Sequence, residues 1–318
     1  MKFMVINDYN RYEKLECKLY VLGGPKEGES IVFILLGDGK ILYSCAVDSF
    51  LYKQQVAIVP IMEQERIKEL SDVFWTHPHD DHSKGLLDII DKFQPKNVYI
   101  PEHLIDLPEG KAKASRKVLE VINCYSGWDR RKKGYHPAIK AVSSNKVIIS
   151  RNLLLKDMEV PFYIFALAPS SCGIRRDVIK KDYHALNDYS IALMVVVGDF
   201  SIFLTGDIQD RMVEYVKEEI VSEVYCPNIL KIPHHGSKDS LALLSLYDEC
   251  VCDISVTTAK RTSSLPCEEA LVEYKKYSKL LYKIDSGNSN MAMWGVSVDI
   301  GNATITKLCH DNYVEYCG

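Results

Sequence analysis

The chain has 318 residues, a formal net charge of −4 and a hydrophobic content of 47%. This composition is that of an ordinary globular protein with a sizeable core, and it excludes a chain that is disordered along its whole length. The acidic balance also argues against a surface coated in positive charge for bulk binding of nucleic acid, but it leaves room for a local basic groove.

No apolar stretch is long enough to cross a membrane, because the longest runs, Ile31–Leu36 and Ile191–Val197, have the length of buried strands. The segment from Met1 to Lys14 lacks the apolar core of a secretion signal, so we expect a cytoplasmic protein with no membrane partner. The ten cysteines include no Cys-x-x-Cys pair. We therefore expect reduced, mostly buried thiols, with Cys250 and Cys252 as strand residues rather than metal ligands.

The first third of the chain has the pattern of a β-rich unit followed by mixed strands and helices. The pair Asp38-Gly39 predicts a hairpin turn between two apolar strands. The expected strands are Cys17–Leu22, Ile31–Leu36, Ile41–Val47, Asp72–Trp75 and Asn97–Ile100, and the expected helices lie around Met62–Leu70 and Lys84–Phe93.

The segment from about 104 to 147 differs in composition, and we interpret it as an insertion within a single domain that spans residues 1–318. Two interpretations of its positive charge remain open. It is either a solvated face, or an anion-binding lip with Trp128 and Tyr135 as stacking surfaces. The cations are Lys111, Lys113, Arg116, Lys117, Arg130, Arg131, Lys132 and Lys133, against the acids Glu120 and Asp129.

The second half repeats the β-rich pattern and then alternates strands with helices. Gly198-Asp199 predicts a second hairpin, and Pro266 in a first helical turn predicts a helix that runs to about Leu281. The expected strands are Phe162–Leu167, Ser190–Val197, Phe200–Leu204, Ile229–Ile232, Trp294–Ile300 and Thr304–Leu308, with a helix over Met212–Ile220. This organisation predicts an α+β fold, a sandwich of two sheets covered by helices.

Three polar clusters follow predicted buried strands, at positions where loops from distant parts of a chain can converge. They are His77-Pro78-His79-Asp80-Asp81-His82, Thr205-Gly206-Asp207 and His234-His235-Gly236-Ser237. Imidazole and carboxylate groups are the ligands that hold zinc or manganese. One histidine at a strand end is usually structural, but three histidines and an aspartate gain nothing from crowding unless a cation is present.

The spacing of the first cluster predicts two neighbouring metal ions. His77 and His79 alternate along the loop and can hold one ion, while Asp81 and His82 are offset to hold a second. Asp207 is placed to bridge both ions, although by itself it would be explained equally well as a helix N-cap. Paired ions activate a water molecule as hydroxide and polarise the bond under attack, so the cluster predicts a metallohydrolase. We expect two Zn²⁺ ions, with one ion or Mn²⁺ as alternatives.

These motifs, together with Asn187-Asp188-Tyr189-Ser190, resemble the metallo-β-lactamase superfamily, and their spacing is most similar to the nuclease domain of ComEC-like competence proteins. The resemblance covers about residues 17–103 and 160–300, and it implies an αββα sandwich of two mixed sheets. It assigns His77 and His79 to site one and Asp81 and His82 to site two, with Asp207 between them. It also implies that His235 is a metal ligand and that His234 contacts the scissile phosphate or the leaving group.

The chain departs from this family where many relatives carry a further histidine for site one, because it has Ala168-Pro169-Ser170 there. His184 or Asn187 could supply the missing ligand of site one. Alternatively, the protein works with a single metal ion. We predict Asp81 and His234 as catalytic residues. Lys84, Asn187 and Ser237 are further candidates for contact with substrate.

The fold alone does not identify the bond that is cleaved. The ComEC-like motifs and the basic insertion favour phosphodiester hydrolysis, with nucleic acid or a small phosphodiester as the substrate. Two alternatives remain open: an esterase or lactonase for small molecules, and a regulatory subunit of a multiprotein complex, such as a defence system.

Overall fold

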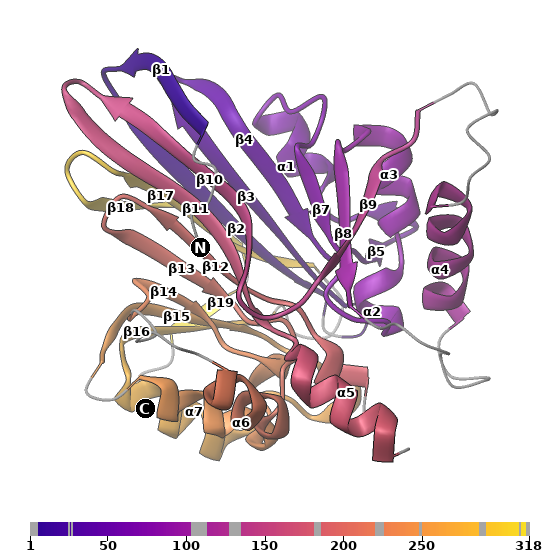
Figure 1. Cartoon of the computed structure of the whole chain (residues 1–318). Helices are drawn as coiled ribbons and strands as arrows, with labels where there is room; N and C mark the ends of the chain where they lie inside the picture. Colours follow the sequence, from indigo (N-terminus) through magenta and orange to yellow (C-terminus); the bar gives the residue numbers. More distant parts are fainter. Residues whose placement is uncertain are drawn as a thin grey trace.

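Two β-sheets lie face to face, and helices cover their outer faces (Figure 1). The structure is a computed structural model. It describes residues 6–24, 26, 28–102, 113–126, 135–180, 186–219, 226–247, 250–285, 291–311 and 313–315. The arrangement is the αββα sandwich of two mixed sheets that the sequence predicts.

The first sheet is antiparallel on one side and parallel on the other. In the described residues its order is β18-β17-β2-β3-β4-β7-β8-β9. The Asp38-Gly39 hairpin is confirmed, since both residues have positive φ and join two antiparallel strands. The strands are β2 (Leu15–Gly24), β3 (Gly28–Gly37), β4 (Lys40–Val47), β7 (Asp72–Phe74), β8 (Asn97–Pro101), β9 (Ala138–Val142), β17 (Ala292–Asp299) and β18 (Thr304–Asp311).

The second sheet is also mixed, with the order β1-β10-β11-β12-β13-β14-β15-β16-β19 in the described residues. Its strands are β1 (Ile6–Tyr12), β10 (Lys146–Leu155), β11 (Met158–Ala168), β12 (Ala192–Val197), β13 (Phe200–Leu204), β14 (Ile229–Lys231), β15 (Cys252–Thr258), β16 (Ser278–Ile284) and β19 (Tyr313–Glu315). A separate small hairpin joins β5 (Leu51–Tyr52) to β6 (Gln55–Val56).

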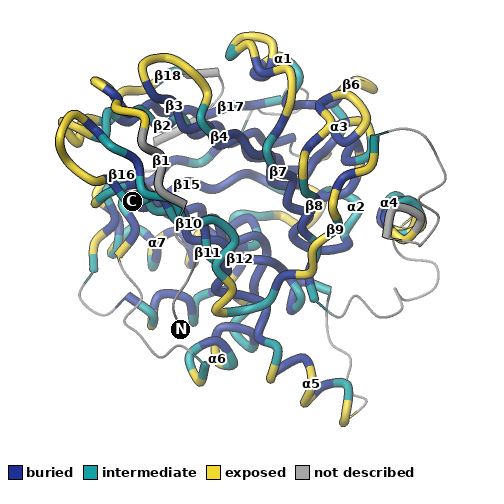
Figure 2. The backbone as a smooth tube through the Cα atoms, turned by 45° about the horizontal axis from the view of Figure 1, so that its top comes forward, coloured by how far each residue is buried: buried dark blue, intermediate teal, exposed yellow. Residues whose placement is uncertain are grey.

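Helices cover both outer faces, as Figures 1 and 2 show. None of the described helices has the length and apolar character needed to cross a bilayer. The α-helices are α1 (Val59–Gln64), α2 (Asp80–Ser83), α3 (Leu86–Phe93), α4 (Lys113–Ser126), α5 (Ser171–Lys180), α6 (Asp210–Glu219) and α7 (Glu268–Lys276). Short 3-10 turns are η1 (Leu186–Tyr189), η2 (His234–Gly236), η3 (Lys238–Leu246) and η4 (Arg261–Ser263).

The alternation of side chains along the strands explains the layers. Phe33 of β3 packs between the sheets, whereas its neighbours Val32 and Ile34 pack outward against α1 and α3. Phe203 of β13 likewise faces outward, against α6 and α7, while Ile202 and Leu204 face the other sheet. Because successive strand residues point to opposite faces, three apolar layers result, one between the sheets and one under each set of helices.

Two predicted helices are wrong in extent. The helix expected to run to about Leu281 ends at Lys276, because Ser278–Ile284 forms strand β16 beside β15. The β-branched and aromatic residues at its end pair within the sheet, which outweighs the helical periodicity of the segment. The helix expected around Met62–Leu70 begins earlier, at Val59, and ends at Gln64.

The predicted insertion contains α4 and β9 in its described part. β9 pairs in parallel with β8 and is the edge strand of the first sheet. Trp128 and the cations Lys111 and Arg130–Lys133 lie outside the described residues.

The expectation of reduced cysteines is wrong for one pair, since Cys226 and Cys250 form a disulfide. Cys250 also lies before β15 rather than in a strand. The two residues precede neighbouring parallel strands, so the sheet brings their sulfurs together across 24 residues of chain, which their spacing could not show. Cys17, Cys45 and Cys252 are free and buried, as expected.

Candidate metal centre

Loops from both sheets meet at the carboxyl ends of the parallel strands. In the first sheet Val47 of β4 pairs with Phe74 of β7, so the residues that follow these strands lie side by side. In the second sheet Leu204 pairs with Lys231, and Lys231 with Val256, across β13, β14 and β15. The three polar clusters follow β7, β13 and β14, and the fold brings all three together.

Short backbone contacts join the two halves at this point. Ile191 N donates to Thr76 O at 2.9 Å, which ties the segment before β12 to the first cluster. Gly206 has a φ of 54°, and a Cβ at this position would overlap Ser190 Oγ, so glycine is required in the Thr-Gly-Asp motif. Ser190 Oγ accepts a hydrogen bond from Asp207 N at 2.9 Å, which holds the loop that carries the Asp207 carboxylate.

Four side chains present ligand atoms to one another at the position of site two. Oδ2 of Asp81 lies 3.6 Å from Nε2 of His82 and 3.7 Å from Nε2 of His235. Oδ2 of Asp207 lies 3.4 Å and 3.9 Å from the same two nitrogens. Ligands about 2 Å from one tetrahedral ion lie roughly 3–4 Å apart, so this spacing suits a single metal ion.

His77, His79 and Asp207 lie together at the position predicted for site one. Nε2 of His77 lies 3.0 Å from Nδ1 of His79 and 3.8 Å from Oδ2 of Asp207. The same Asp207 oxygen therefore faces both sites, which is the position that a bridging carboxylate would need.

Each fully buried imidazole is held at the ring nitrogen that points away from the cluster. A hydrogen bond from Nδ1 selects the tautomer that leaves the Nε2 lone pair available to a metal. The partners at Nδ1 are Asp48 Oδ2 for His82 at 2.7 Å, Thr258 Oγ1 for His235 at 2.8 Å, and Thr76 Oγ1 for His77 at 3.0 Å.

Asp48 is a residue of this site that the sequence analysis did not identify. Its carboxylate also accepts hydrogen bonds from Thr76 N at 2.7 Å and Thr76 Oγ1 at 2.5 Å. Asp48, His77 and His82 offer atoms within 4.8 Å of one another, but both Asp48 oxygens already accept hydrogen bonds. Asp48 therefore orients His82 rather than joining it as a ligand. An aspartate directly after the apolar strand Ile41–Val47 was the available signal.

A buried ion pair beneath His235 was also not predicted. Lys231 and Glu29 are 0% and 3% exposed, and Nζ lies 2.8 Å from Oε2. The Thr258 hydroxyl donates to the same Glu29 oxygen, so the Thr258 oxygen is left to accept from His235 Nδ1. The pair thus fixes the direction of the hydrogen bond that orients His235.

Five atoms of the cluster are buried and have no hydrogen-bond partner in the described part of the chain. They are Asp81 Oδ2, His82 Nε2, both carboxylate oxygens of Asp207, and His235 Nε2. An unpaired buried polar atom costs about 1–3 kcal/mol, so such atoms are normally satisfied. A divalent cation coordinated by them would remove this cost, and nitrogen with carboxylate oxygen is a donor set that zinc accepts. The residues therefore fit a metal site.

The protonation states also suit a cation. Burial, followed by the nearby His82, holds the pKa of His77 well below its usual value and lowers the pKa of His79 to about 4. Burial opposes ionisation of Asp81 and Asp207, but neighbouring imidazoles, His82 foremost, outweigh it and lower the pKa of both carboxyls. Burial likewise lowers the pKa of His82, yet the surrounding carboxylates raise it well above normal. The cluster therefore stabilises positive charge at its centre.

His234 lies beside the cluster, whereas His235 faces Asp81 and Asp207. Asn187 Nδ2 lies 3.1 Å from His234 Nε2, and Gln209 Nε2 lies 3.4 Å from His234 Nδ1. Burial lowers the pKa of His234, which favours the neutral form of its ring. A half-buried neutral imidazole held between two amides can contact a substrate without binding the metal.

The other candidates for substrate contact lie in different surroundings. Ser237 Oγ accepts from Asp239 N at 3.3 Å and caps η3, which accounts for its position without a substrate. Lys84 is exposed, and within the described residues it forms no ion pair with the cluster.

No histidine takes the place of the missing site-one ligand among the described residues. After β11, Ser170 is fully buried and its Oγ donates to Glu219 Oε1 at 2.7 Å, toward α6. Asn187 contacts His234 instead of the first cluster. His184 lies outside the described residues.

Lys260, which follows β15, approaches the cluster from its open side. Its Nζ lies 2.5 Å from Asp81 Oδ2, although not with the geometry of a hydrogen bond. His79, Asp81, His234 and Lys260 are partly exposed, in contrast to the buried His77, His82, Asp207 and His235. These four residues are therefore the part of the cluster that solvent can reach.

Asp80 faces away from the cluster and holds α4 against α2. Its Oδ1 accepts from Ala114 N at 3.0 Å, and Ser83 Oγ lies 2.8 Å from Ser115 Oγ. The start of α4 thus lies next to the first histidine cluster. It carries the described, exposed cations of the basic segment, Lys113, Arg116 and Lys117.

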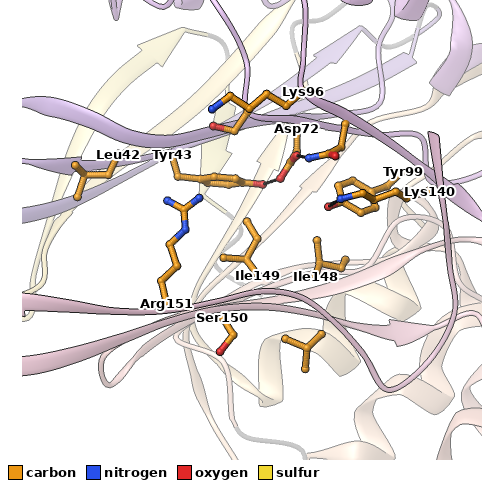
Figure 3. A pocket seen from close by; sticks show the side chains of 13 residues that line it. Leu42, Tyr43, Asp72, Lys96, Tyr99, Lys140, Ile148, Ile149, Ser150 and Arg151 are labelled. Carbon is orange, nitrogen blue, oxygen red and sulfur yellow. Dashed lines mark hydrogen bonds between the residues drawn. The ribbon is translucent and has the colours of Figure 1, made fainter. Parts of the chain in front are cut away.

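A cavity of about 420 Å³ lies at the opposite ends of β7 and β8 and is separate from the metal cluster (Figure 3). Asp72 on its floor accepts from Tyr43 Oη at 2.7 Å and from Asn97 Nδ2 at 2.6 Å. Its other charged lining residues are Lys96, Lys140 and Arg151.

Comparison with known proteins adds two sequence matches. The family model described as Metallo-beta-lactamase superfamily matches residues 56–208. ComE operon protein 3 of Bacillus subtilis (strain 168) is 27% identical over 187 residues, which is 58% of this chain and 19% of that protein. The chain therefore spans about a fifth of the length of this curated relative.

Solved structures with a similar arrangement are distant in sequence. Igni18, a metallo hydrolase from Ignicoccus hospitalis KIN4/I, is 12% identical with a TM-score of 0.44, over 87% of this chain and 98% of that one. A diphosphatase from the PhnP family is 14% identical with a TM-score of 0.40, over 88% and 98%. Zn²⁺-bound PqqB from Methylobacterium extorquens is 10% identical with a TM-score of 0.38, over 82% and 86%. These similarities are too distant to indicate a shared substrate.

Proposed function

We propose that this chain is a metal-dependent hydrolase of the metallo-beta-lactamase superfamily, whose family model matches residues 56–208, and that it hydrolyses phosphodiester bonds in nucleic acid or in a smaller phosphodiester. The observation that carries this proposal is the convergence, from two halves of the chain, of five buried nitrogen and oxygen atoms that have no hydrogen-bond partner in the described residues. Positive charge beside them, from Lys260 and from the start of α4, supports an anionic substrate over a neutral ester.

The residues of the site have separate tasks in this proposal. Bound divalent ions would supply an activated water and polarise the bond under attack. The expected ion is Zn²⁺, with Mn²⁺ as the alternative. His77, His79 and Asp207 would hold one ion, and Asp81, His82 and His235 would hold a second with Asp207. Asp48 and Thr258 keep the rings of His82 and His235 in the orientation that metal binding requires.

The role of His234 follows from its place beside the cluster. Its two ring nitrogens face the side-chain amides of Asn187 and Gln209, so a hydrogen bond to the substrate would replace one of these two contacts. We propose that it contacts the phosphate or the leaving group, as the family resemblance implies.

The test is hydrolysis by metal-free protein to which Zn²⁺ or Mn²⁺ is restored. We expect cleavage of single- or double-stranded DNA, or of bis(p-nitrophenyl) phosphate, and faster turnover of the diester than of p-nitrophenyl acetate or a simple lactone. Faster turnover of the neutral esters would instead support the esterase or lactonase alternative. Binding of less than one equivalent of metal, without hydrolysis, would support the regulatory subunit.

A further inference from the structure

Lys260 is placed by rigid backbone next to the proposed metal ligands. Lys260 N donates to Leu265 O and Leu265 N donates to Lys260 O, both at 3.0 Å, so the residue is anchored directly after β15. Ala259 N also donates to Ile284 O at 2.9 Å. Thr258, two residues earlier, holds the ring of His235. The same strand end therefore supplies both a support for a ligand and a cation beside it.

The partner of Lys260 distinguishes it from the cations around it. Arg261 pairs with Asp285 at 3.0 Å, and Lys238 pairs with Glu269, so both charges are balanced by acids outside the cluster. Lys260 instead pairs with Asp81, through the Oδ2 atom that also faces His82 and His235. A carboxylate oxygen that holds a divalent ion is a poor partner for a second cation, because the ion and the ammonium repel each other. Metal binding and the Lys260–Asp81 ion pair therefore compete.

We infer that Lys260 is a substrate-binding residue that selects for an anion. Its side chain is 21% exposed and lies on the open side of the cluster, with His79 and His234 also partly exposed there. An ammonium on a flexible four-carbon stem can leave Asp81 and bind a negatively charged oxygen that lies against the metal site. The inference rests on the proposed function and narrows its substrate class to anions.

The test compares Lys260→Met, which keeps the stem and removes the charge, with Lys260→Arg, which keeps the charge. Lys276→Met is the matched control, because Lys276 is exposed on α7 and pairs with Glu273 at 2.7 Å. The first measurement is the affinity of metal-free protein for Zn²⁺, titrated against a chromophoric chelator. We expect Lys260→Met to bind Zn²⁺ at least as tightly as the wild type, because Asp81 loses a competitor.

The second measurement is binding of dimethyl phosphate, an unreactive monoanionic diester, to zinc-loaded protein by calorimetry. We expect Lys260→Met to raise the Kd by about tenfold or more, the effect of one charge-assisted hydrogen bond, while Lys260→Arg retains most of the affinity. The KM for bis(p-nitrophenyl) phosphate should rise in parallel, and turnover of p-nitrophenyl acetate should stay at the level of the Lys276→Met control.

Two outcomes would overturn the inference. Weaker Zn²⁺ binding by Lys260→Met would show that Lys260 supports the metal ligands instead of competing for them. An unchanged Kd for dimethyl phosphate would show that it does not bind the anion. If dimethyl phosphate binding depends on Lys260 but no diester is cleaved, the proposed hydrolysis fails and the anion site stands. If the diester is cleaved equally well by wild type and by Lys260→Met, the proposed hydrolysis stands and the anion site at Lys260 fails.

Discussion

Aspartates with buried carboxylate oxygens lie near both ends of β7, and their oxygens differ in hydrogen bonding. Asp72, at the amino end, is 3% exposed and accepts hydrogen bonds from Tyr43 and Asn97. Beyond the carboxyl end, Asp81 and Asp207 present buried oxygens with no hydrogen-bond partner in the described residues. Burial is common to both ends, so burial alone does not identify a functional carboxylate. What separates the ends is whether the chain itself satisfies the buried oxygens.

The pKa values follow the same division. Burial raises the pKa of Asp72, although hydrogen bonds from Asn97 and Tyr43 partly offset this effect. At the other end, neighbouring imidazoles outweigh burial and lower the pKa of Asp81 and Asp207. The Asp72 carboxylate links β7 to β4 and β8 through its hydrogen bonds with Tyr43 and Asn97. The carboxylates of Asp81 and Asp207 are held in the ionised form, but their buried oxygens accept no hydrogen bond within the described residues. A divalent cation would satisfy the buried oxygens of this pair, and it would displace Lys260 from Asp81.

Replacement of Asp81 should have the largest effect. We expect Asp81→Ala to reduce metal-dependent hydrolysis by about a thousandfold or more, since a bound metal supplies several kcal/mol of transition-state stabilisation. The fold should persist, because no hydrogen bond of the described structure uses the Asp81 Oδ2 atom. Turnover and circular dichroism of the same preparation provide the check. An unchanged rate would rule out the proposed mechanism.

A smaller effect is expected at Asp48, which orients His82 without facing the metal. Asp48→Asn should weaken metal affinity by about 10- to 100-fold, as is usual when the partner of a metal-bound histidine is removed. Zn²⁺ titration with a competing chelator would measure this loss. Wild-type affinity in the variant would mean that the hydrogen bond between Asp48 and His82 does not support the site.

At the opposite end of β7 the expected effect is on stability and not on activity. Asp72→Ala leaves Tyr43 and Asn97 without their acceptor, so the free energy of unfolding should fall by about 1–3 kcal/mol. Urea denaturation gives the free energy, and the zinc content and turnover of the folded variant serve as controls. Loss of bound metal in folded Asp72→Ala would show that Asp72 affects the metal centre as well as stability, contrary to the distinction drawn between the two ends of β7.

The smallest effect is expected at Lys84. This residue stands beside the first cluster in the sequence but is exposed in the structure. Lys84→Met should change KM for a phosphodiester by less than about twofold, because an exposed lysine contributes little through a screened contact. A large rise in KM would instead restore Lys84 as a substrate-binding residue and would weaken the case for Lys260.

Much of the fold follows from local patterns. The strands at Ile31–Leu36 and Phe200–Leu204 and the two hairpin turns are predictable, because apolar alternation and turn residues act over a few positions. The local pattern gives the wrong prediction at Ser278–Ile284. The apolar residues there keep a helical spacing, but the segment forms strand β16 because it pairs with β15. It also fails at Cys226 and Cys250, whose sulfurs meet because two parallel strands begin side by side.

The sequence by itself determined which donor groups the candidate centre contains, because imidazoles and carboxylates such as His77 and Asp81 have the same ligand chemistry wherever the chain folds. Only the tertiary structure decided which groups orient or oppose these ligands. Asp48, Glu29 and Lys260 are ordinary polar residues at strand ends or in a strand. Asp48 meets His82 because β4 and β7 are neighbours in the first sheet, whereas Glu29 and Lys260 meet their partners when the two sheets pack together. The physical reason is that a candidate ligand can be identified from the type of its side chain, whereas a supporting residue can be identified only from its distance to the ligand. That distance depends on strand register and on sheet packing, which here join residues from 34 to 229 positions apart in the chain.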